Sequence, residues 1–118
     1  MGAALTADAI ERSTYAITIT FYDEEDNLVD PLTAKWTLTD ADGSVINNRE
    51  EVAITSPSSS ETIVLQGDDL VLQGGESGSG ERVFTVEATY DSSLGSGLPL
   101  NDFTTFRVLG LVAVGVAA

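Results

Sequence analysis

Acidic side chains are the groups of this sequence most able to bind a ligand, and several of them are close neighbours. The segment DEEDN at 23–27 includes Asp23, Glu25 and Asp26. Carboxylate oxygens clustered on a loop are suitable ligands for Ca²⁺, so these three residues are calcium candidates. An acidic loop needs no partner other than water, however, and we predict a solvated loop without a metal.

The segment DADG at 40–43 begins like a calcium-binding loop. The full pattern places its glycine later, and Val45 and Ile46 occupy positions where oxygen ligands are needed. Asp and Gly in such an order are typical of tight turns between strands. We therefore predict that DADG closes a β-hairpin.

The residue types that are missing exclude many reactions. The 118-residue chain has no histidine and no cysteine, which rules out His-dependent catalysis, disulfides and the usual zinc sites. With 19 acidic residues, neighbouring carboxylates are expected without any catalytic role. The segment GGESGSG at 74–80 lacks the Lys-Ser/Thr pair of a phosphate-binding loop. We predict a protein that is not an enzyme and has no cofactor.

The net charge of −14, from 5 basic against 19 acidic residues, limits the partners. Nucleic-acid binding depends on Lys and Arg that neutralise phosphates, so we predict no nucleic-acid partner, and an anionic membrane is equally unfavourable. The first residues lack the basic start and apolar segment of a signal peptide. The apolar end of the chain is too short to span a bilayer.

Alternation of apolar and polar residues predicts β-strands along most of the chain. The clearest are STYAITITFY at 13–22, AKWTLT at 34–39 and ERVFTVEATYD at 81–91. Further strands are expected at 44–47, 51–55, 61–66 and 103–112. The segment SSLGSGLPLND at 92–102 is expected to be a long loop, and no segment convincingly predicts a helix.

The only tryptophan, Trp36, suggests how these strands are arranged. An immunoglobulin-like sandwich has a core Trp on its strand C, opposite an alternating strand F. Trp36 lies on the second full strand, and the strand at 81–91 has the expected alternation. We therefore predict an all-β fold, an immunoglobulin-like β-sandwich of about seven strands at 13–108 with extended N- and C-terminal arms, and with Trp36 in its core.

The two arms carry the candidate interface residues. Residues 1–12 could form a helical turn or an extended arm, and we favour an arm that makes contacts through Leu5 and Ile10. Residues 109–118 are apolar and contribute Leu109, Leu111 and Val114. This C-terminal segment either completes the sandwich as part of its last strand or leaves the domain and pairs with a neighbouring molecule.

Three stretches, RSTYAITITF, WTLTDADGSVIN and VEATYDSSLG, resemble small immunoglobulin-like structural proteins of tailed bacteriophages and related archaeal viruses. The resemblance covers residues 12–109 approximately and transfers no functional residue. It implies a virion protein that decorates the capsid or is a minor capsid component, with other virion proteins and copies of itself as partners. The alternatives are a head–tail connector or tail component, a secreted or surface adhesion module, and a calcium-stabilised module of a larger surface protein.

Overall fold

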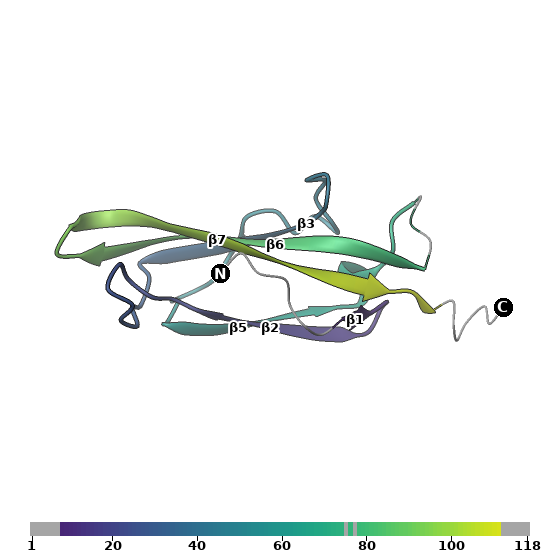
Figure 1. Cartoon of the computed structure of the whole chain (residues 1–118), viewed down its shortest axis with the longest axis horizontal. Coiled ribbons are helices and arrows are strands. Elements are labelled where there is room, and N and C mark those ends of the chain that lie inside the picture. The colour runs from purple at the N-terminus through teal and green to yellow at the C-terminus, as the bar shows by residue number, and fades with distance from the viewer. Residues whose placement is uncertain (1–7, 75, 77, 112–118) are drawn as a thin grey trace.

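The computed structural model describes residues 8–74, 76 and 78–111, and this part of the chain is almost entirely β-structure (Figure 1). The elements are β1 (Ala9–Ile10), β2 (Thr14–Thr20), β3 (Thr33–Asp40), β4 (Val52–Ala53), β5 (Ser60–Gln66), the 3₁₀ helix η1 (Gly67–Leu70), β6 (Ser79–Ser92) and β7 (Gly95–Leu109). The predicted all-β class is confirmed.

The strands form two sheets that face each other (Figure 1). The larger sheet has the order β1-β7-β6-β3-β4, and the smaller one consists of β2 and β5. All pairs are antiparallel except β1 with β7, which run parallel. A mixed five-stranded layer therefore lies over a layer of two strands.

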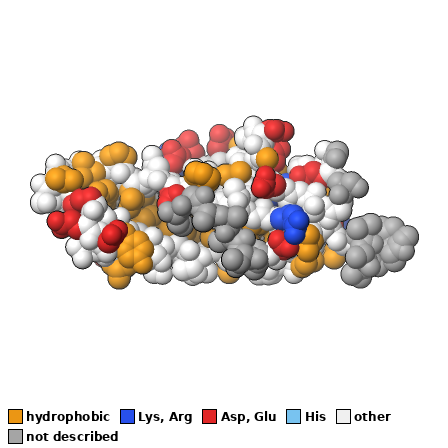
Figure 2. Space-filling model, viewed as in Figure 1, with side chains coloured by type: hydrophobic (Ala, Val, Ile, Leu, Met, Phe, Trp, Pro, Cys, Tyr) orange, Lys and Arg blue, Asp and Glu red, His pale blue; other side chains and the backbone are white. Residues whose placement is uncertain are grey.

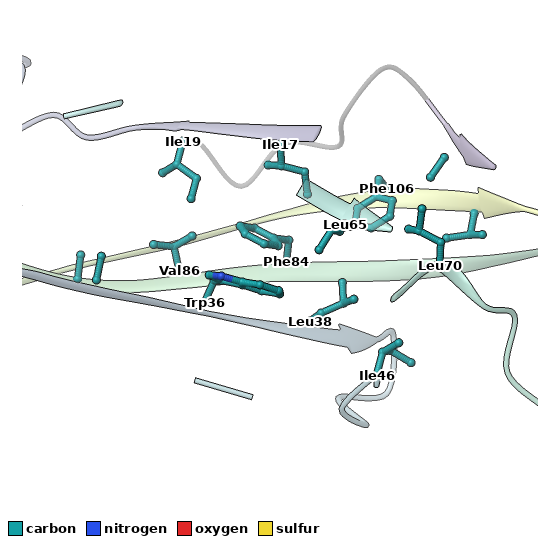
Figure 3. Packing of buried hydrophobic residues seen from close by; sticks show 14 of the residues in the cluster. Ile17, Ile19, Trp36, Leu38, Ile46, Leu65, Leu70, Phe84, Val86 and Phe106 are labelled. Carbon is teal, nitrogen blue, oxygen red and sulfur yellow. The ribbon is translucent and has the colours of Figure 1, made fainter. Parts of the chain in front are cut away.

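Alternating side chains from both sheets fill the space between the layers (Figure 3). Strand β6 buries every second residue, and β2 and β3 do the same along their inner faces, because successive side chains of a strand point to opposite sides. Trp36 is only 6% exposed and stacks on Phe84 with ring centroids 5.3 Å apart. The predicted core position of Trp36 is confirmed.

The predicted loop at 92–102 is wrong. Strands β6 and β7 form one long hairpin in which only Ser93 and Leu94 separate the two strands. A register shift between Tyr90 and Ser92 precedes the turn. The glycines and Pro99 concealed this strand in the sequence, yet proline is tolerated on a strand that forms a sheet edge. Within the described residues, β1 pairs with β7 only at Val108 and Leu109. No further described strand therefore lies beside Pro99, and the missing N–H of this proline breaks no hydrogen bond of the sheet.

The strands predicted at 44–47, 51–55 and 103–112 also differ from the structure. The first is reduced to a single bridge between Thr39 and Val45, because Asn47 and Asn48 adopt φ values of 52° and 57° that end the extended chain. Only Val52–Ala53 remains of the second. The third begins earlier, at Gly95, and ends at Leu109.

Candidate functional site

The DADG segment forms the expected turn. The Oδ1 atom of Asp40 accepts hydrogen bonds from the main-chain N–H groups of Asp42 and Ser44, both at 2.9 Å. Gly43 has a φ of +90°, a conformation that favours glycine. The turn prediction is confirmed, and one oxygen of the Asp40 carboxylate serves to stabilise the turn.

The acidic loop at 23–27 is organised in the same way. The Oδ1 atom of Asp23 accepts N–H groups of Glu25 and Asn27, both at 2.9 Å, and Asp26 has a φ of 63°. No group of three metal-ligating side chains is present within the described residues. The calcium candidates Asp23, Glu25 and Asp26 therefore share a loop without forming such a group, and a solvated loop without a metal stays a prediction.

A tyrosine that the sequence did not single out as functional fastens this loop to the larger sheet. The hydroxyl of Tyr90 donates a hydrogen bond of 2.7 Å to Oε1 of Glu24. This bond to a carboxylate, with the burial of the hydroxyl and the nearby negative charge, raises the pKa of Tyr90. Tyr90 on β6 thus holds the acidic loop against the end of the sandwich.

Asp69, at 1% exposure, is the centre of a second network. Its carboxylate accepts hydrogen bonds from Nε of Arg49 at 2.7 Å, Nδ2 of Asn47 at 2.8 Å and the main-chain N–H of Gln66 at 3.1 Å. Burial by itself would raise the pKa of Asp69, but the three hydrogen bonds and the charge of Arg49 together outweigh it and lower the pKa. A general acid needs the opposite shift, so this carboxylate is built to hold the 47–49 segment on η1.

A third network surrounds Arg82, the largest fully buried side chain. Its guanidinium forms two hydrogen bonds with the carboxylate of Glu76 and donates to the carbonyl oxygens of Glu81 and Val71. The hydrogen bonds from Arg82 are the main reason that the pKa of Glu76 is lowered. Alternation along residues 81–91 puts Arg82 on the same strand face as Phe84, but the sequence does not identify Glu76 as its partner.

One groove of about 500 Å³ opens between β2 with its following loop and strands β6 and β7. Its lining combines buried apolar side chains with three carboxylates. The lining residues are Thr18, Ile19, Thr20, Phe21, Tyr22, Asp23, Asp26, Val86, Leu100 and Asp102. The three carboxylates of the lining disfavour an anionic ligand.

The predicted interface residues fall into two groups. Ile10 is 43% exposed on β1 and pairs in register with Leu109, which is half-buried. Leu111 is also half-buried, and its N–H donates to Oε1 of Glu11 at 3.1 Å. Leu5 and Val114 lie outside the described residues. Ile10 is therefore the predicted contact that the structure places at an open surface.

The charge of the visible face is dispersed. Figure 2 shows acidic side chains scattered over this face and hydrophobic side chains gathered at the end where the hairpin of β6 and β7 projects. The turn of this hairpin includes Leu94, which is 70% exposed.

Comparisons with protein-family models, with curated proteins and with solved structures return no match for this chain. Within the described residues, no helix has the length and apolarity needed to cross a bilayer.

Proposed function

We propose that this chain is an immunoglobulin-like domain that serves as a non-enzymatic structural component of a tailed virus particle, as a capsid decoration or minor capsid protein. The observation that carries the fold assignment is the pairing scheme. β2 pairs with β5 as strand B pairs with E, and β3, β6 and β7 lie in the order C, F, G. β4 pairs with β3 at Lys35 and Trp36, on the side of strand C where a further strand C′ lies in variable-type domains.

The packing of Trp36 supports the same proposal. The indole lies on the strand that corresponds to C and stacks on Phe84 of the strand that corresponds to F. The parallel pairing of β1 with β7 adds a first strand to the same sheet. The virion assignment itself depends on the resemblance of the three sequence stretches described above.

The roles of the described side chains agree with a binding module more than with a catalyst. The carboxylates of Asp69 and Glu76 are paired with arginines, and their pKa values are lowered. The proposed contacts to neighbouring virion proteins are made by the terminal segments. Among the predicted contacts that the structure describes, Ile10 is the exposed one. Many weak contacts in a repeating shell would give firm attachment.

The test is to locate the protein in purified virus particles of the source. Quantitative mass spectrometry should find the chain in fixed ratio to the major capsid protein, and immunogold labelling should mark the capsid. Labelling confined to the neck or tail would replace the decoration role by a connector or tail role. A chain that is abundant in lysate and absent from purified particles would contradict the virion proposal.

A matched pair of variants tests the contact surface. Ile10→Asp should reduce the amount of protein that joins particles, because a new charge is placed in the proposed interface. Leu28→Asp introduces the same charge at a residue that is 62% exposed, between β2 and β3, and should leave incorporation unchanged. Equal incorporation of both variants would show that Ile10 is not at the contact.

A further inference from the structure

The two sheets protect their edges very differently. The larger sheet ends in β1 and β4, each of only two residues, and very short edge strands are a common defence against unwanted pairing. The smaller sheet has two seven-residue strands, TYAITIT and SETIVLQ, with Glu61 as their only charged residue. Neither strand contains lysine or proline, the residues that commonly block an edge.

The hydrogen-bond pattern shows which main-chain groups of β5 point outward. Gly67 donates its N–H to the carbonyl of Ser13, and Phe21 donates to Ser59, so these pairs mark the hydrogen-bonded positions of the ladder. Because the pattern repeats every two residues, the N–H and C=O groups of Thr62 and Val64 face away from β2. Among the described residues, no partner is seen for these groups.

The side chains around this edge are also suited to a contact. Val64 is 51% exposed, and Ile63, which faces the core, is only partly buried. The outer face of the small sheet has no charge, although the chain has 19 acidic residues. The carboxylate of Glu61 accepts hydrogen bonds from the N–H and hydroxyl of Ser58. A negatively charged protein thus has an uncharged outer face on the sheet that ends in this edge.

We propose that the free edge of β5 pairs antiparallel with β5 of a second copy, which joins the two small sheets into one four-stranded sheet. The edge of β2 is the weaker candidate, because β1 and the start of the described chain lie on that side. This proposal concerns self-association and does not depend on the proposed virion function.

The strand is complementary to itself in one full-length register. With Ile63 opposite Ile63 of the second copy, Thr62 lies opposite Val64 and Ser60 opposite Gln66, so every residue of β5 is paired. Thr62 and Val64 then supply about four main-chain hydrogen bonds across the two-fold axis. The two Glu61 residues are about 13 Å apart along the strands, roughly the screening length at 0.1 M salt. The same sequence therefore satisfies both sides of the contact.

A seven-residue edge is about 23 Å long, so the contact is small and the dimer weak. Two chains of charge −14 also repel each other at long range, and salt screens this repulsion. Light scattering and sedimentation of the full chain should show a monomer–dimer equilibrium that shifts toward dimer at high protein concentration and molar salt. A monomer under all these conditions would overturn the proposal.

The edge is identified by two matched substitutions. Thr62→Pro removes the outward N–H of β5, whereas Thr18→Pro makes the same change at the residue directly opposite on β2. Both variants lose the hydrogen bond between the hydroxyls of Thr18 and Thr62. Only Thr62→Pro should also abolish the dimer. Loss of the dimer in Thr18→Pro, with Thr62→Pro still dimeric, would place the contact on β2 and overturn the proposal.

A second pair of variants tests the same edge without proline, which could itself disturb the strand. Val64→Lys puts two lysines about 7 Å apart in the proposed register, whereas Ala16→Lys adds the same charge to the opposite residue of β2. Val64→Lys should be monomeric and Ala16→Lys should keep the dimer. Circular dichroism and thermal unfolding of each variant confirm that the fold is intact, and equal association of the two variants would contradict the proposal.

Discussion

Arg82 and Glu76 lie six residues apart and form two parallel hydrogen bonds, Nη1 to Oε2 at 2.8 Å and Nη2 to Oε1 at 2.7 Å. The guanidinium is completely buried, while the carboxylate is 21% exposed. A buried arginine needs such a partner, because the free energy of an unpaired buried charge is very unfavourable. The pair therefore fixes the loop that precedes β6 onto the end of the sandwich.

Removing the carboxylate should destabilise the whole domain. Glu76→Gln leaves the guanidinium buried without a counter-charge, and we expect the free energy of unfolding to fall by about 3 kcal/mol. Urea unfolding followed by the fluorescence of Trp36 measures this change. Glu81→Gln, at an exposed neighbouring residue, is the control and should change stability little. Equal stability of the two variants would show that the ion pair is not important for the fold.

Gly80 should be required for the same contact. A Cβ atom at this residue would collide with the carboxylate of Glu76. We expect Gly80→Ala to push Glu76 away from Arg82 and to lower the melting temperature, with a loss of about 1–3 kcal/mol. At Gly74 an added Cβ meets no atom within 4 Å, so Gly74→Ala is the matched control. A melting temperature of Gly80→Ala equal to that of the control would contradict the close packing.

Acid should unfold the domain through Asp69 and Glu76, whose pKa values are both lowered in the folded state. The unfolded chain then takes up protons at a higher pH than the folded chain. The resulting stability is complete above the unfolded pKa values of about 4 and is lost as the pH falls through the folded values. We expect the free energy of unfolding to decrease steeply below about pH 4.

Asp69→Asn should flatten this pH dependence. The variant should be less stable than the parent at neutral pH. In acid the two stabilities should become similar, because protonation then removes the charge of Asp69 in the parent as well. Unfolding at a series of pH values measures the slope, with exposed Asp68→Asn as control. If the free energy of unfolding of the variant changed with pH as much as that of the parent, Asp69 would not be the cause of the acid sensitivity.

Calcium should not stabilise the protein specifically. Asp23 already accepts two main-chain N–H groups, and the described residues contain no group of three metal-ligating side chains. We expect millimolar CaCl₂ and MgCl₂ to shift the melting temperature equally at matched ionic strength. A larger rise with Ca²⁺ that disappears in Asp26→Asn would instead establish the loop as a calcium site, since binding to the folded state raises stability.

Much of the strand content could be read from the sequence. Period-two alternation identified β2, β3 and β6 and the inward residues of each, because burial of one sheet face selects apolar side chains at every second position. Trp36 was correctly placed in the core. The β6–β7 hairpin was missed because Gly, Ser and Pro normally indicate a loop, whereas pairing with β6 keeps residues 95–102 extended.

The partners of charged residues could not be derived in the same way. Composition and alternation alone predict an acidic all-β chain without histidine or cysteine, and they indicate which face of each long strand is buried. The folded structure was needed to show that Arg82 pairs with Glu76, that Asp69 pairs with Arg49, and that β5 ends the small sheet. Side-chain periodicity is a local property of the chain, whereas ion pairs and sheet edges depend on which distant segments the fold brings together.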